Sequence, residues 1–184
     1  MARTETPAAE LGWSAPDFAL PGIDGATHAL QDLKGSRGTV IAFICNHCPY
    51  VKAITDRLVE DVEEMQEFGV NLIAICSNDA AAYPEDSFDK MKTFAKERGF
   101  NFHYLHDESQ KVAKAYGALC TPDFFGFDKD LKLKYRGRLD MGRTEAPPDG
   151  APRDLVNAMG QIAEHGAGPR EQFPSMGCSI KWRE

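Results

Sequence analysis

The sequence predicts an α/β fold in which a mixed central β-sheet has helices on both faces and is preceded by an N-terminal β-hairpin. Two continuous apolar runs, residues 39–44 and 70–76, are rich in β-branched side chains, as is typical of strands buried on both faces. A segment with helical spacing of apolar residues follows each run. Two more strand-like runs, joined by a polar turn, precede a last amphipathic segment, and this order indicates a mixed sheet between two helical layers.

The first elements are expected to be a hairpin, a buried strand and a long helix. Residues 15–20 and 27–30 flank a turn with two glycines, which predicts a short hairpin. The apolar run over 39–44 gives the first central strand. A helix is expected over 49–68, because its apolar residues recur at helical spacing opposite a row of acidic residues. Gly69 then ends this helix.

The rest of the chain continues the alternation. Proline is well suited to the first turn of a helix, as at residue 84, and the polar turn before residue 132 predicts an antiparallel strand pair. Prolines and glycines over 141–152 predict a loop. The elements expected here are a strand over 70–76, a helix over 84–98, a strand over 101–105, a short helix over 109–116, strands over 123–128 and 132–138, and a helix over 153–165.

Length and composition predict one domain. The chain has 184 residues, of which 42% are hydrophobic, enough for a single sizeable core. No repeat, low-complexity tract or linker divides it. We therefore expect one domain over residues 1–184, with residues 1–14 and 166–184 as terminal extensions.

Charge and hydropathy exclude some classes of partner. The net charge is −7 at pH 7, whereas binding to nucleic acid or to an anionic membrane needs a concentrated basic surface. No segment is apolar enough to span a bilayer, and the first residues have no signal-peptide core. We expect a cytoplasmic protein without nucleic-acid or membrane partners.

The five cysteines direct attention to one close pair. Their number is odd and they are spread along the chain, unlike the dense, even set of a small secreted scaffold. In a reducing compartment a close cysteine pair indicates catalysis or metal binding rather than a structural cross-link. Cys45 and Cys48 form that pair.

The segment from Cys45 to Cys48 predicts thiol–disulfide chemistry. A buried strand that runs through C-x-x-C into a helix places Cys45 near the helix N-terminus, where backbone N–H groups favour a thiolate. Cys45 is therefore expected to be the nucleophile and the more acidic, more exposed thiol, and Cys48 the resolving thiol. Asn46 and His47 are expected to support the thiolate.

Three separated motifs resemble the thioredoxin superfamily, and within it the peroxiredoxin-like (redoxin, or AhpC/TSA-type) branch. They are the G-x-x-A-P-D-F-x-L pattern over residues 12–20, the C-x-x-C pair, and Thr121 followed by Pro122. The resemblance implies a thioredoxin fold without a bound organic cofactor. It also implies a cis Pro122 beside the redox pair, with Thr121 and Pro122 contacting substrate.

The sequence departs from true peroxiredoxins at two positions. Those enzymes have the peroxidatic cysteine where Cys48 stands, a Thr or Ser at the position of Cys45, and an Arg near Pro122. The hydrogen-bonding groups that activate a peroxide are therefore expected to be missing, which weakens an antioxidant function. The tail over residues 174–182 also resembles the ending of thioredoxin-like proteins of this branch.

Three functions compete. The leading one is a thiol–disulfide oxidoreductase that acts on disulfide-containing proteins or small molecules and is regenerated by a cellular dithiol reductant. A thiol peroxidase that reduces hydroperoxides is the second. The third is a Cu- or Zn-binding protein that uses Cys45, Cys48 and a histidine, because thiolates suit both metals. No metal ligand is assigned, and His103 and His106 are expected to be surface residues.

The three remaining cysteines receive no assigned role. Cys76 lies in an apolar strand and is expected to be an inert core thiol. Cys120 adjoins the proline loop, but strand alternation is expected to turn it away from the side that Thr121 takes. Cys178 has no partner evident in the sequence. Mild oxidation is therefore expected to join Cys45 to Cys48.

Overall fold

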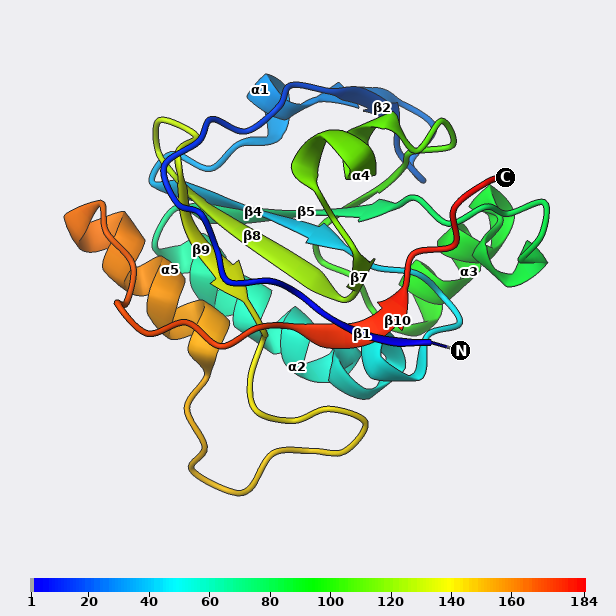
Figure 1. Ribbon diagram of the computed structural model, residues 1–184. Coiled ribbons are helices and arrows are strands. Elements are labelled where there is room, and N and C mark those ends of the chain that lie inside the picture. Colours follow the sequence, from blue (N-terminus) through cyan, green and yellow to red (C-terminus); the bar gives the residue numbers. More distant parts are fainter. Residues whose placement is uncertain (1) are drawn as a thin grey trace.

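The computed structural model describes residues 2–184 and has a five-stranded central sheet (Figure 1). Strand β4 lies in the middle and pairs in parallel with β5 and in antiparallel with β8. The order β6-β5-β4-β8-β9 confirms the predicted mixed sheet. The strands are β4 (Gly38–Phe43), β5 (Val70–Cys76), β6 (His103–His106), β8 (Asp123–Asp128) and β9 (Leu133–Gly137).

Helices cover both faces of this sheet, as predicted. One layer contains α2 (Pro49–Glu67), α3 (Phe88–Glu97) and α5 (Asp154–His165), and the other contains α1 (Leu30–Leu33) and α4 (Lys111–Tyr116). Figure 1 shows α1 and α4 on the side of the sheet opposite α2 and α5. Alternation along β4 divides the core between them, because Val40 and Ala42 face the layer of α2 whereas Ile41 and Phe43 face the other.

The N-terminal hairpin is confirmed. Strands β2 (Ala19–Pro21) and β3 (Thr27–Ala29) pair in antiparallel and form a small separate sheet. Phe18 and Leu20 are buried against the α4 side of the central sheet. The hairpin therefore closes one face of the core, on the side away from α2.

The helix expected over 84–98 is broken in the structure. A 3₁₀ turn, η1 (Pro84–Asp86), comes first, and α3 begins only at Phe88. Ser87 separates them with extended backbone angles, and its hydroxyl accepts a hydrogen bond from Lys90 N at 3.4 Å, so it caps α3. The break has a structural consequence, because it leaves Asp86 buried in the interior.

The two segments expected as terminal extensions contribute strands. A second, three-stranded sheet has the order β1-β10-β7, with β1 (Arg3–Glu5), β10 (Met176–Ser179) and β7 (Cys120–Thr121). In Figure 1 the two ends of the chain run side by side across the end of β7. Both ends are therefore part of the domain. Within residues 2–184, no helix has the length and apolar character that a membrane crossing requires.

Candidate functional site

The topology brings Cys45, Cys48, Thr121 and Pro122 together. Strand β4 ends at Phe43, which pairs with Asp123 at the start of β8, so the loops next to these strand ends are neighbours. The Thr121–Pro122 peptide bond is cis, as the family resemblance implied. The Cys45 Sγ atom lies 3.3 Å from Thr121 Oγ1, and the Cys48 thiol donates to the Thr121 carbonyl oxygen at 3.2 Å.

Both thiols of the pair are enclosed. Cys45 and Cys48 are each 0% exposed, and Thr121 is buried beside them. Strand β10 pairs with β7 over this site, with Cys178 opposite Thr121. The expectation that Cys45 would be the more exposed thiol is therefore wrong, because Cys45 is as fully buried as Cys48.

The helix N-terminus lies at Cys48 rather than at Cys45. Cys48 is the N-cap residue of α2, and Pro49 occupies the first helical position, where its missing N–H costs nothing. The backbone N–H of Val51 in the first turn donates to the Cys48 sulfur. The unpaired amides of the helix end therefore act on Cys48, and Cys45 lies three residues before it in the loop.

The pKa values of the two thiols are shifted in opposite directions. A hydrogen bond from Cys45 lowers the pKa of Cys48, and Cys178 and the Val51 N–H add to this effect against the cost of burial. The hydrogen bond from the Cys48 thiol to the Thr121 carbonyl oxygen favours the protonated form, but more groups donate to Cys48 and favour its thiolate. The same pairing raises the pKa of Cys45 well above its ordinary value, as do burial and the negative charge of Asp86. This order of pKa values is the reverse of the one expected from the sequence, in which Cys45 is the more acidic thiol.

Asn46 fixes the loop between the cysteines. Its side-chain oxygen accepts a hydrogen bond from the Tyr104 hydroxyl at 2.8 Å, and its side-chain nitrogen donates to the Glu85 carbonyl oxygen at 3.0 Å. The Asn46 backbone N–H donates to Asp86 at 2.8 Å. The structure therefore uses Asn46 to position the loop.

His47 lies between Asp86 and Tyr83. Its Nδ1 atom is 2.6 Å from Asp86 Oδ2, and its ring stacks on that of Tyr83 with centroids 5.8 Å apart. The ligand atoms of Cys45, His47 and Asp86 all lie within 4.8 Å of one another. This trio differs from the expected metal set of Cys45, Cys48 and a histidine. His103 belongs to a second group, with Asp24 and His28.

A buried ion pair supports the proline loop from behind, and sequence reasoning missed it. Arg136 contacts both carboxylate oxygens of Asp123, at 3.3 and 3.0 Å, and donates to the Gly117 carbonyl oxygen at 2.9 Å. Asp123 also accepts from the Leu119 N–H at 3.3 Å. These contacts tie both sides of Thr121–Pro122 to the central sheet.

Sequence reasoning also missed Asp86 and Cys178. Asp86 lies in an acidic turn that reads as solvent-exposed, and only the break before α3 explains its burial. Cys178 lies in a segment with weak strand periodicity, and its position depends on pairing with a strand far away in the sequence. The sequence signal for Cys178 was its position between Gly177 and Ser179, within the tail motif over residues 174–182 that resembles the tails of related proteins.

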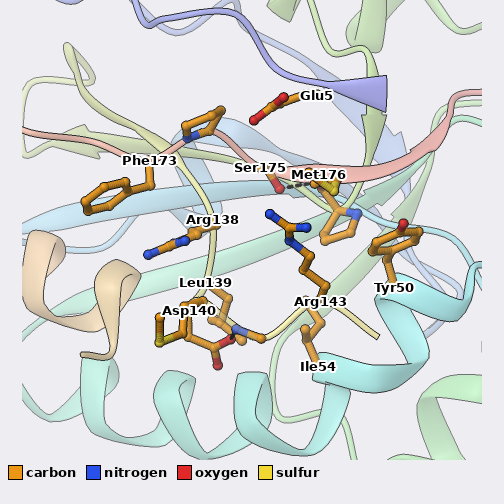
Figure 2. A pocket seen from close by; sticks show the side chains of 14 residues that line it. Glu5, Tyr50, Ile54, Arg138, Leu139, Asp140, Arg143, Phe173, Ser175 and Met176 are labelled. Atoms are coloured by element: carbon orange, nitrogen blue, oxygen red, sulfur yellow. Dashed lines mark hydrogen bonds between the residues drawn. The ribbon is translucent and has the colours of Figure 1, made fainter. Parts of the chain in front are cut away.

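A cavity of about 180 Å³ lies beside the proline loop (Figure 2). Pro122 lines it from the proline loop, Met176 from β10, and Tyr50 from the first turn of α2. Figure 2 shows Arg143 pointing into the cavity toward Ser175, whose hydroxyl donates to the Pro122 carbonyl oxygen at 2.6 Å. The cavity therefore reaches the proline loop from the side of the 141–152 loop.

Comparison with known proteins places the chain in a family. The model of the AhpC/TSA family matches residues 11–136. The chain belongs to this family. A thiol-disulfide oxidoreductase ResA from Geobacillus thermodenitrificans is 30% identical over 131 residues, which is 71% of each chain. A chloroplastic peroxiredoxin Q from Triticum aestivum is 29% identical over 111 residues, 60% of this chain and 46% of that protein.

Solved structures agree with the fold. An uncharacterized conserved protein from Geobacillus kaustophilus is 48% identical, with a TM-score of 0.91 over 100% of this chain and 97% of that one. The thioredoxin domain of a thiol-disulfide oxidoreductase from Bacteroides vulgatus has a TM-score of 0.65 at 14% identity, over 85% and 99% of the two chains. The predictions of a thioredoxin fold and of a thiol–disulfide oxidoreductase are confirmed at this level.

Proposed function

We propose that this AhpC/TSA-family oxidoreductase reduces or exchanges disulfides with Cys48 as nucleophile and Cys45 as resolving thiol. The observation that carries this assignment is the position of Cys48 at the N-cap of α2, in contact with the Cys45 thiol. The proposal reverses the two roles expected from the sequence. It keeps the same pair.

The steps follow from the contacts of the pair. The Cys48 thiolate attacks a substrate disulfide, which forms a mixed disulfide on Cys48 and releases one substrate thiolate. Cys45 then loses its proton and attacks the Cys48 sulfur, so the second substrate thiolate leaves and a Cys45–Cys48 disulfide remains. A dithiol of the cell reduces that disulfide and restores both thiols.

Thr121 and Pro122 are proposed to contact the substrate. Both cysteines already touch Thr121, through its hydroxyl and its carbonyl oxygen, and the next residue, Pro122, lines the cavity. Asn46 and His47 support the pair by holding its loop against Tyr104 and Asp86. A disulfide-containing protein or small molecule is the proposed partner class.

Reduction of a chromogenic disulfide by the protein, with dithiothreitol as electron donor, tests this function. Cys48→Ser is expected to abolish turnover, and Cys45→Ser to slow it, because the resolving thiol of the pair is lost. Cys120→Ser is the matched control, because Cys120 is an equally buried thiol in β7 that lies outside the pair. Full turnover by a variant that lacks both Cys45 and Cys48 would disprove the assignment.

A thiol peroxidase is the second candidate, and the low pKa of Cys48 favours it. A lone acidic thiolate at a helix N-terminus is the group that would attack a hydroperoxide. Cys45 stands where peroxiredoxins have Thr or Ser, so the hydroxyl expected to help activate a peroxide is missing. Arg136, the arginine behind the proline loop, is already bound to buried Asp123. We propose that hydroperoxide reduction, and with it an antioxidant role, is secondary. Rapid, saturable peroxide turnover that Cys48→Ser abolishes would make it the main activity.

We also propose a cytoplasmic location. The odd number of dispersed cysteines supports it, because thiols of this kind are kept in reducing compartments. A dithiol reductant of that compartment would then be the electron donor. Fractionation of cells that express the full protein, with detection by antibody, tests this proposal, and recovery from an oxidising compartment would refute it.

A further inference from the structure

The C-terminal strand β10 is built into the redox site. It pairs in antiparallel with β7, with Cys178 opposite Thr121 and Ser179 opposite Cys120. A side chain at Gly177 would overlap the Thr121 carbonyl group, so glycine permits this close approach. Beyond the strand, the Ile180 N–H donates to the Leu119 carbonyl oxygen at 3.1 Å. The tail is therefore fixed along the edge that carries the proline loop.

This pairing places a third thiol, that of Cys178, beside the Cys48 sulfur. Cys178 pairs with Thr121, and the Thr121 carbonyl oxygen accepts from the Cys48 thiol at 3.2 Å, so Cys178 and Cys48 meet at the same residue. The thiol and the backbone N–H of Cys178 are both oriented as donors to Cys48. Cys178 is 3% exposed, so the contact is enclosed. The Cys48 sulfur thus has two thiol neighbours, Cys45 from its own loop and Cys178 from the tail.

The other two cysteines have different surroundings. Cys76 lies within β5, and its hydrogen-bonding neighbours are Tyr104 and the Asn78 backbone rather than Cys48. The Cys120 sulfur is 3.6 Å from the Pro122 carbonyl oxygen. Cys120 directly precedes Thr121 in the short strand β7. Successive strand residues point to opposite faces, so Cys120 and Thr121 project to different sides. Among the three cysteines outside the C-x-x-C pair, Cys178 is the one in contact with the nucleophile.

We propose that Cys178 is a second resolving thiol for Cys48. The inference rests on the proposed function in taking Cys48 as the thiol that forms the mixed disulfide. Cys178 loses its proton and attacks the Cys48 sulfur, the bond from Cys48 to the substrate breaks, and the substrate leaves as a thiolate that takes up a proton. The products are a Cys48–Cys178 disulfide and a fully reduced substrate, so one substrate disulfide is exchanged for one protein disulfide.

The position of Cys178 gives this reaction a structural consequence. Resolution by Cys45 leaves the oxidised pair inside the loop before α2, whereas resolution by Cys178 links that loop to the C-terminal strand. Because β10 lies against β7 and Cys48, a Cys48–Cys178 disulfide holds this strand in place until a dithiol reduces it. Each oxidised molecule therefore carries one of two alternative disulfides, Cys45–Cys48 or Cys48–Cys178.

The test isolates Cys178 by removing the first resolving thiol. Reduced Cys45→Ser protein is treated with oxidised glutathione, and free glutathione and intact protein mass are measured. We expect two molecules of reduced glutathione per protein and a Cys48–Cys178 disulfide in the peptide map. The double variant Cys45→Ser/Cys178→Ser is expected to release one molecule and to keep glutathione on Cys48. Cys45→Ser/Cys120→Ser is the matched control and should behave as Cys45→Ser does.

The folded state is checked by circular dichroism and urea unfolding, and Cys45→Ala and Cys178→Ala repeat the test without a hydroxyl at either site. If Cys45→Ser forms no Cys48–Cys178 disulfide with oxidised glutathione or with diamide, the inference is wrong, whether Cys48 is glutathionylated or stays reduced. Failure of the proposed function has a different signature. In that case wild-type protein turns over no disulfide substrate, while the Cys48–Cys178 bond still forms in Cys45→Ser.

Discussion

In the loop that carries the two cysteines, His47 Nδ1 lies 2.6 Å from a carboxylate oxygen of Asp86. The same carboxylate accepts hydrogen bonds from the Asn46 N–H at 2.8 Å and from Asn78 Nδ2 at 2.7 Å. Asp86 is fully buried, so its charge acts on the neighbouring thiols through a medium that screens it weakly. One acidic residue therefore both holds the loop and adds to the rise in the pKa of Cys45 that the Cys48 hydrogen bond and burial produce.

Replacing Asp86 should lower the pKa of Cys45. The negative charge of Asp86 disfavours a Cys45 thiolate, so Asp86→Asn, which keeps the size of the side chain, should let this thiolate form at lower pH. The variant should also lose about 1–3 kcal/mol of stability, because the buried hydrogen bonds to the loop are rearranged. Thiolate absorbance near 240 nm in a Cys48→Ser background measures the shift. An unchanged or raised Cys45 pKa would contradict the role given to Asp86.

Cys48 should be the thiol that ionises at mildly acidic pH. Burial raises the pKa of Cys76 and Cys178 to about 12 each, so these thiols do not contribute to thiolate absorbance below about pH 9. We expect the low-pH transition to persist in Cys45→Ser, whose hydroxyl can still donate to Cys48, and to vanish in Cys48→Ser. The opposite pattern would restore Cys45 as the acidic thiol, as the sequence suggested.

The central sheet and its helices could be predicted because their signals are local. The β4 and β5 runs are uniformly apolar, and α2 shows helical periodicity over its whole length, so each element is visible within its own segment. Strands β7 and β10 have only two and four residues. They exist because they pair with each other, and a pairing between distant segments leaves no periodic signal in either one.

The sequence predicted which residues form the site better than it predicted how they are arranged. Spacing identified Cys45 and Cys48, and the motif around Pro122 identified the loop that meets them. The start of α2 could have been placed better, because Pro49 in the first helical position marks Cys48 as the N-cap. Asp86 and Cys178 act on the pair through tertiary contacts, so neither their burial nor their effect on the pKa values could be derived from spacing.

Breaking the Arg136–Asp123 pair should destabilise the proline loop. Arg136→Met leaves the buried Asp123 carboxylate without its cation, which costs about 3–5 kcal/mol of unfolding free energy. Arg136→Met combined with Asp123→Asn should recover part of this loss, since no buried charge is then left alone. Arg183→Met is the control, because the Arg183 side chain is 52% exposed and lies 3.5 Å from Asp79. Urea unfolding of the four proteins measures the effect, and equal losses in both single variants would refute it.

Asp61 should make the stability depend on pH between about pH 4 and pH 6. Burial raises the pKa of this α2 carboxyl from 3.8 to about 6, although Arg153 donates to it at 2.8 Å. Because the folded state holds the proton more tightly than the unfolded state, the contribution of Asp61 is fully present below about pH 4 and is lost as the pH rises through 6. The loss is on the order of 3 kcal/mol.

Asp61→Asn should remove this contribution. Urea unfolding at several pH values from 4 to 7 gives the difference in unfolding free energy between wild type and variant, in which the other carboxyl groups cancel. We expect wild type to lose stability relative to Asp61→Asn as the pH rises. Asp56→Asn, on the same helix with an 80% exposed side chain, should show a difference that does not vary with pH. If the Asp61→Asn difference is equally flat, burial does not govern this carboxyl and the Arg153 pair dominates instead.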